Sequence, residues 1–269
     1  MQDTHQNDNQ PEPEQCVRER DGAIIAYHRT ACKGEKKRAD EPGVVFLTGF
    51  KSDMTGGKAL HLEAHARDRG LDFLRFDYTG HGRSSGVFEE GTIGQWAEDA
   101  IFALDNLTEG PQVLVGSSMG GWIMLLVARA RPERVKGLVG IAAAPDFTED
   151  LMWNVFNDEQ RADLAEKGRV LVPNCYDDQE PYALTRALIE DGRDQLLLRQ
   201  PFVFDGPVRL IHGLLDEDVP WKTALRLQET ITGSDVEVTL VKGGGHRLSE
   251  PHDLDRMTQA LDAVMARLL

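Results

Sequence analysis

The stretch V-L-V-G-S-S-M-G-G-W, residues 113–122, decides the fold expected for this chain of 269 residues. At its centre, residues 116–120 have the form G-x-S-x-G, with Ser118 in the middle. Residues 112–115 are mostly apolar and β-branched, as in a buried parallel strand, and residues 118–131 have the apolar composition of a buried helix. A strand, a tight glycine turn and a helix are the context of a nucleophile elbow, which raises the serine hydroxyl above the sheet. The pattern therefore predicts Ser118 as a nucleophile.

The two glycines of the motif have a steric role in this interpretation. Side chains at Gly116 and Gly120 would collide with the strand and the helix, so the turn requires glycine at both positions. The alternative is a glycine-containing turn in which Ser118 is an ordinary helix cap. Because G-x-S-x-G also occurs by accident, the choice depends on whether the chain supplies catalytic partners for the serine.

A histidine is the first partner required, because a serine hydroxyl is a weak nucleophile without a base. In the order typical of this elbow, an acid and then the histidine follow the serine in the chain. Among the eight histidines, His246 and His252 lie in the C-terminal quarter. His246 stands in a glycine-rich loop after the strand-like run 236–241, whereas His252 stands at the expected start of the last helix, a usual place for a solvated side chain. The sequence therefore predicts His246 as the base.

A carboxylate must orient the histidine, and Asp216 is the predicted acid. It follows the apolar run 208–212, in a turn after a late strand. Asp218 is expected to turn away and to cap the next helix. Asp146, after the preceding strand, is the other alternative, because some hydrolases take their acid from that position. His212 is expected to be a buried structural histidine rather than a second base.

Two backbone N–H groups are the predicted oxyanion donors. One belongs to Met119, at the N-terminus of the helix that follows the nucleophile. The other belongs to Phe50, which follows the early strand at residues 44–48. Gly49 is expected to let the backbone approach the substrate, or else to be a simple turn residue.

Strand-like and helix-like segments alternate along the chain. This alternation predicts a single α/β domain over residues 19–269, with a mostly parallel central sheet, helices on both faces, and reactive residues at the carboxyl ends of strands. The predicted strands cover residues 23–27, 44–48, 71–77, 112–115, 137–142, 208–212 and 236–241. The predicted helices outside the insertion cover residues 58–69, 92–107, 118–131 and 253–267. Residues 1–18 are predicted to be a disordered acidic tail.

The longest departure from this alternation is an insertion at about residues 145–206, which predicts a small helical lid over the strand ends. A helix is expected there over residues 182–192. An apolar cluster at residues 151–156 makes Trp153 a candidate to line the substrate site; the alternative is that the cluster packs the lid onto the core. A glycine-rich loop makes His81 a second such candidate, with loop ordering as its alternative.

The composition of the chain argues against several other classes of protein. The chain is 41% hydrophobic and 28% charged, with no apolar run near the ~20 residues of a membrane-spanning helix. Its net charge of −15 disfavours nucleic acid and anionic membranes as partners. Three scattered cysteines, Cys16, Cys32 and Cys175, argue against a disulfide framework and against a metal site. The run 54–58 lacks two positions of a phosphate-binding loop, and no cofactor is expected. The polar N-terminus has neither signal-peptide nor transit-peptide character, so a cytoplasmic location is predicted.

Together these residues give the chain a resemblance to the α/β-hydrolase fold family. Within that family it is similar to the serine hydrolase branch that contains the mitochondrial acyl-glucuronide esterase and the palmitoyl-protein thioesterase of animals. The closer likeness lies in residues 49–54, 58–59, 75–78, 116–122, 130–134, 209–213, 216, 219–221 and 246–247. The resemblance implies Ser118 as nucleophile, Asp216 as acid and His246 as base. It is weakest in the lid.

The expected function is that of a serine esterase or thioesterase, which cleaves carboxylic esters or thioesters through an acyl-enzyme intermediate without a cofactor. Its substrate would be a small-molecule ester or acyl thioester, with acylated protein included, and the chain would be a monomer or a homodimer. Hydrolysis of a C–C bond and acyl transfer are alternatives on the same triad. A protein of another class, one that binds an acyl ligand or a protein partner without turnover, is the remaining alternative.

Overall fold

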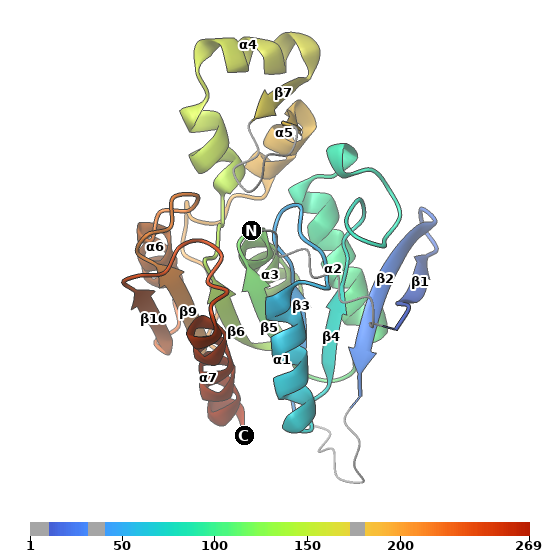
Figure 1. Ribbon diagram of the computed structural model, residues 1–269, viewed down its shortest axis with the longest axis vertical. Coiled ribbons are helices and arrows are strands. Elements are labelled where there is room, and N and C mark those ends of the chain that lie inside the picture. Colours follow the sequence, from blue (N-terminus) through green and yellow to red (C-terminus); the bar gives the residue numbers. More distant parts are fainter. Residues whose placement is uncertain (1–10, 32–40, 173–180) are drawn as a thin grey trace.

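A central eight-stranded sheet organises the computed structural model, which describes residues 11–31, 41–172 and 181–269 (Figure 1). The strand order is β1-β2-β4-β3-β5-β6-β9-β10. The strands are β1 Glu14–Arg18, β2 Ala23–Thr30, β3 Gly43–Leu47, β4 Phe73–Phe76, β5 Gln112–Ser117, β6 Val135–Ile141, β9 Val208–Gly213 and β10 Val236–Val241. From β4 to β10 all neighbours pair in parallel, whereas β1 and β2 are antiparallel. The predicted mostly parallel α/β sheet is confirmed.

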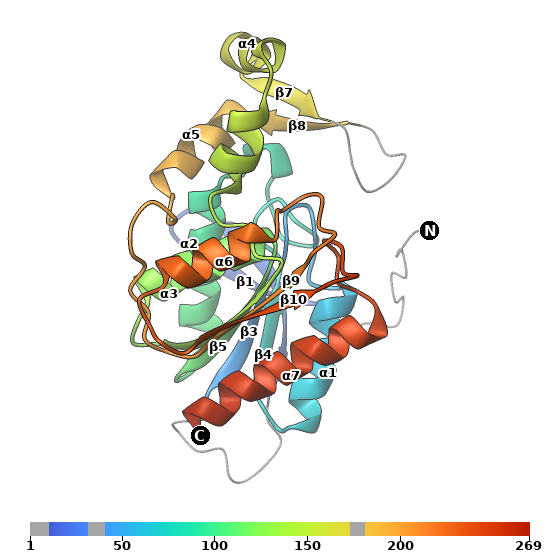
Figure 2. The same ribbon diagram turned by 90° about the vertical axis from the view of Figure 1, so that its left-hand side faces the viewer.

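Helices cover both faces of this sheet, as predicted. Two of them, α1 Gly57–Asp68 and α7 Pro251–Leu268, pack on one face. These two helices contact the strands and also contact each other. The other face is covered by α2 Ile93–Leu107, α3 Met119–Ala130 and α6 Lys222–Thr230 (Figures 1 and 2). Because both faces are covered, β5 is buried along its whole length, and its residues need no polar alternation. The first ten residues of the central helix α3 are buried, and such a position requires a helix that is apolar on all sides.

The N-terminal segment differs from its prediction. Residues 1–18 were expected to form a disordered tail, which is wrong for Glu14–Arg18, because these residues form β1 and pair with β2 across the turn at Gly22. The φ angle of Gly22 is 73°, a conformation that glycine adopts without strain. Cys16 lies in β1 as a free, partly buried thiol. Residues 1–10, Cys32 and Cys175 lie outside the described part of the chain.

The excursion between β6 and β9 lies beyond the carboxyl ends of the central strands (Figures 1 and 2). It contains the short helical turns η2 Thr148–Met152 and η3 Trp153–Val155, the helices α4 Asp158–Lys167 and α5 Arg186–Asp194, and the hairpin strands β7 Arg169–Val172 and β8 Tyr182–Thr185. The helix predicted over 182–192 is therefore wrong in its first turn. Tyr182–Thr185 pair with β7 instead, and Thr185 caps α5 by accepting a hydrogen bond from the backbone N–H of Leu188.

Candidate active site

Ser118 lies on a sharp turn between β5 and α3, at the carboxyl end of the central strand. Its φ and ψ are 53° and −118°, a combination that is strained for a residue with a side chain. A Cβ atom at Gly116 would overlap the backbone of Gly120, and one at Gly120 would overlap the carbonyl oxygen of Leu47. Both glycines are required by close backbone approach, as predicted from the G-x-S-x-G motif.

His246 joins Ser118 to Asp216. The His246 Nε2 atom is 3.0 Å from the Ser118 Oγ atom, and the His246 Nδ1 atom is 2.8 Å from the Asp216 Oδ2 atom. An ionised carboxylate only accepts hydrogen bonds, so Nδ1 carries the hydrogen and Nε2 is left to accept the proton of the serine hydroxyl. The three residues come from the ends of β5, β9 and β10, which meet at one edge of the sheet. The other candidate base, His252, is exposed on α7 and lies beside Asp253.

Asp216 is buried, and hydrogen bonds engage both of its carboxylate oxygens. Oδ1 accepts from the backbone N–H groups of Asp218 and Val219, at 3.0 and 2.8 Å, and Oδ2 accepts from His246. Burial alone would raise the pKa of Asp216, but the hydrogen bonds from His212, His246 and Val219 outweigh it and hold this pKa well below its usual range. Asp216 therefore presents a permanent negative charge to the imidazole of His246.

Asp146, the alternative acid, has a different place in the fold. Its carboxylate accepts hydrogen bonds from the backbone N–H groups of Leu197 and Leu198, at 2.8 and 2.9 Å, and pairs with Arg199. Arg199 also pairs with Asp150. Asp146 thus ties the start of the excursion to its end. Burial raises the pKa of its carboxyl group.

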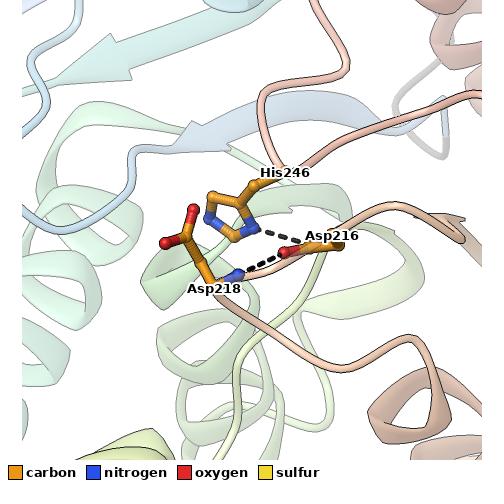
Figure 3. A group of neighbouring side chains, drawn as sticks. All are labelled: Asp216, Asp218 and His246. Carbon is orange, nitrogen blue, oxygen red and sulfur yellow. Dashed lines mark hydrogen bonds and ion pairs between the residues drawn. The ribbon is translucent and has the colours of Figure 1, made fainter. Parts of the chain in front are cut away.

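Asp218 does not lie where the sequence suggested. Helix α6 has Trp221 as its N-cap and no side-chain capping bond, so the expected cap by Asp218 is wrong. Instead, Asp216, Asp218 and His246 each place a potential ligand atom within 4.8 Å of the others, and Figure 3 shows the Asp218 carboxylate beside the imidazole. Such a set could hold a cation, but the bond between Asp216 and His246 already accounts for two of its members. The predicted absence of a metal stays a prediction.

The loop after β3 passes directly beside the nucleophile. A Cβ atom at Gly49 would be 3.4 Å from the Cβ atom of Ser118. The far end of this loop is held at Met54, whose N–H donates to the Asp77 carboxylate at 2.7 Å and whose carbonyl accepts from Arg75 at 3.2 Å. Burial raises the pKa of Asp77 to about 6. This arrangement suits a backbone donor at Phe50, but the oxyanion roles of Phe50 and Met119 stay predictions.

Aromatic side chains surround the ring of Phe50, a feature that no sequence motif indicated. The ring centres of Phe88, Phe147 and Tyr182 lie 4.9, 5.8 and 6.0 Å from that of Phe50. A narrow crevice, too tight for a water molecule, adjoins this group between Phe50 and the excursion. We call it the Phe50 cavity, and it is lined by Phe50, Phe88, Trp96, Ala183, Thr185 and Leu188, with Glu89 and Gly91. No local pattern could have revealed it, because its walls come from four separate segments.

The two predicted substrate-lining residues are both held by neighbouring side chains. His81 is buried, with 4% of its surface exposed, and its ring contacts the rings of Phe88 and Trp96 at 5.1 Å. Its Nδ1 atom donates to the carbonyl of Thr79 at 3.3 Å, which fits the loop-ordering alternative. The Trp153 ring lies 4.6 Å from the guanidinium of Arg193, inside the excursion. A lining role for either residue stays a prediction.

His81→Phe is expected to change how stability depends on pH. Burial lowers the pKa of His81 from 6.5 to about 4, because the folded chain favours the neutral ring. Below pH 6.5 the unfolded chain therefore binds a proton that the folded chain does not bind, so the free energy of unfolding is at its full value above 6.5 and is lost as the pH falls through about 4. Relative to the unmodified chain, the variant should therefore gain up to about 3 kcal/mol of unfolding free energy between about pH 7 and pH 4. Urea unfolding across this range measures the difference. His252→Phe, at an exposed position, is the control, and a constant difference for His81→Phe would contradict the prediction.

A mostly parallel sheet with a strained serine at the carboxyl end of a central strand is the architecture of an α/β hydrolase. Residues 44–261 match the Alpha/beta hydrolase family, and the chain belongs to this family. Over 234 residues it is 37% identical to the mitochondrial palmitoyl-protein thioesterase ABHD10 of Homo sapiens, an alignment that covers 87% of this chain and 76% of that protein. The branch resemblance seen in the sequence is confirmed.

Solved structures agree with this assignment. The mouse alpha/beta hydrolase domain-containing protein 10 superposes with a TM-score of 0.87 at 35% identity, covering 96% of this chain and all of that one. A putative hydrolase from Agrobacterium vitis gives a TM-score of 0.88 at 40% identity, covering 95% of this chain and 100% of its own. The ABHD10 relatives are named as mitochondrial proteins, so they do not support the predicted cytoplasmic location. Within the described residues, none of the helices has the length and apolar character that a membrane crossing needs.

Proposed function

We propose that this hydrolase cleaves acyl thioesters and carboxylic esters through a triad of Ser118, His246 and Asp216. The observation that carries the proposal is the continuous hydrogen-bonded chain from the Ser118 hydroxyl through His246 to Asp216, at 3.0 and 2.8 Å, on a strained elbow. An isolated serine cap would need neither a histidine acceptor nor a buried carboxylate behind that histidine.

In the proposed reaction, His246 Nε2 takes the proton of Ser118 as the hydroxyl oxygen attacks the substrate carbonyl. The N–H groups of Phe50 and Met119 stabilise the negative charge that develops on the carbonyl oxygen. Asp216 stabilises the imidazolium form of His246 through Nδ1. His246 then protonates the departing thiolate or alkoxide, activates a water molecule, and so allows hydrolysis of the acyl-serine.

The substrate class follows from the relatives and from the walls of the site. The ABHD10 relatives are named palmitoyl-protein thioesterases, and long acyl chains need an apolar surface. The aromatic group around Phe50 provides such a surface next to the proposed oxyanion loop. We therefore assign long-chain S-acyl groups on proteins or peptides as substrates, with the excursion at about residues 145–206 as the lid above them.

Hydrolysis of a matched substrate panel tests this function. The panel contains an S-palmitoyl peptide, palmitoyl-CoA, an acyl glucuronide and p-nitrophenyl esters from C2 to C16, together with a fluorophosphonate probe. We expect labelling at Ser118 and turnover of the long-chain thioesters. Labelling without turnover of any member would overturn the substrate assignment, and the absence of both would overturn the triad itself.

Ala183→Phe is expected to change the acyl-length profile. The Phe50 cavity is too narrow for a water molecule in this conformation, so a long acyl chain has to part its walls, and the added ring opposes this opening. We expect kcat/KM for C16 substrates to fall roughly tenfold, since about 1–2 kcal/mol of apolar contact is lost, while the value for C2 esters stays unchanged. The measurement is kcat/KM across the p-nitrophenyl series. Val155→Phe, an exposed position outside this cavity, is the matched control. Equal losses for C2 and C16 would show that the acyl chain lies elsewhere.

A further inference from the structure

A second histidine contacts the acid of the proposed triad. His212 lies near the end of β9 and is buried, with 1% of its surface exposed. Its Nε2 atom is 3.1 Å from the Asp216 Oδ2 atom and 2.9 Å from the carbonyl oxygen of Val219. The steps of the reaction described above use neither nitrogen of this ring.

The partners of His212 determine where its hydrogen lies. A carbonyl oxygen and an ionised carboxylate are both acceptors, so the Nε2 atom between them must carry the hydrogen. Asp216 Oδ2 therefore accepts from the His246 Nδ1–H and shares the His212 Nε2–H with the carbonyl of Val219, while Oδ1 accepts from two backbone N–H groups. Four donors thus define the rotation of one buried carboxylate.

We propose that His212 is a positioning residue, which holds the Asp216 carboxylate in the orientation that His246 needs and takes up part of its negative charge. The inference rests on the proposed triad and deepens it. Without His212, the Oδ2 atom would keep His246 as its remaining side-chain donor, and the carboxylate could rotate toward the space that the imidazole leaves. The His246 ring would then be less well oriented. Its imidazolium form would also face a negative charge that is more concentrated on the Oδ2 atom of Asp216.

Other charged and polar groups around His246 also influence its protonation, and they stay the same when His212 is replaced. Asp218 places a carboxylate oxygen within 4.8 Å of a ring nitrogen of His246, and Ser118 faces Nε2. Lys58 of α1 donates to the carbonyl of Arg247, next to His246, at 2.6 Å. A replacement of His212 leaves all of these in place, so a change in the pH profile reports on Asp216.

The decisive comparison is His212→Met against His212→Gln. Methionine fills the volume without a donor, whereas the glutamine amide nitrogen can reach the position of Nε2 and donate to Asp216. For His212→Met we expect kcat to fall roughly tenfold or more with little change in KM, since a hydrogen bond to a charged group is lost. The acidic limb of the kcat/KM profile should also move to higher pH. His212→Gln should restore both quantities to near the original values.

A readout that does not need turnover accompanies the kinetics. The hydrogen-bonded His246 Nδ1–H proton gives a low-field NMR resonance, which should shift in His212→Met and not in His212→Gln. If His212→Met fails to fold, His212→Asn replaces it, because its shorter amide cannot reach Asp216. Equal losses in both variants with an unmoved acidic limb and resonance would mean a purely structural histidine and would overturn the proposal. If the original chain is inactive on every substrate but its resonance still shifts in His212→Met, the proposed function is refuted. The positioning role of His212 would then still stand.

Discussion

Replacing Ser118 by alanine is expected to lower kcat by about 10,000-fold or more on every substrate that the chain hydrolyses. The loss follows from the removal of the atom that would form the acyl bond, which His246 and the oxyanion donors cannot replace. The melting temperature should stay within a few degrees, because alanine removes only the hydroxyl group and leaves the glycine contacts of the elbow intact. Single-turnover kinetics and fluorophosphonate labelling measure the loss, and thermal unfolding checks the fold.

Ser117→Ala is the matched control for this variant. It removes a hydroxyl from the adjacent residue of β5, which has no assigned role in the reaction. We expect its kcat to stay within a few-fold of the original value and its labelling to persist. If Ser118→Ala kept more than a few per cent of the activity, the nucleophile assignment would be wrong and the serine would be an ordinary turn residue.

Gly120→Ala is expected to have the largest effect on stability, a loss of about 3 kcal/mol or more. The new methyl group would overlap the backbone carbonyl of Leu47 and crowd that of Thr48, and backbone atoms at the end of a central strand cannot move away at low cost. The same displacement would move the loop with Gly49 away from Ser118, so activity should be lost as well. Urea unfolding and esterase assays on the same preparation measure both effects.

Gly57→Ala provides the comparison for a glycine without close neighbours. A Cβ atom there meets nothing within 4 Å, and the residue is the first of α1. The substitution should be neutral or stabilising by about 0.5 kcal/mol, since alanine restricts the unfolded chain. Similar stabilities for Gly120→Ala and Gly57→Ala would refute the steric account of the elbow.

The central strands and the positions of the triad candidates could be predicted from local pattern. Residues of β5, β6 and β9 are buried on both sides, so the physics of parallel sheets requires continuous apolar runs that can be read directly from the chain. The loops at the carboxyl ends of neighbouring parallel strands meet at one edge of the sheet. Chain order and strand ends therefore sufficed to choose Asp216 and His246 as partners for Ser118, and the structure brings the three side chains together.

The environment of these residues was decided by tertiary structure alone. No local pattern shows that Asp146 bonds the backbone at Leu197 and Leu198, or that His212 contacts Asp216. Such contacts depend on how one loop bends back on another, which short-range propensity does not encode. The same holds for the pairing of β8 with β7 and for the aromatic walls beside Phe50, where residues far apart in the chain meet. The sequence alone determined the central parallel strands and the order of the reactive groups, because periodicity and strand ends are local properties. Only the packed structure decided what holds and surrounds those groups, because that depends on long-range contacts.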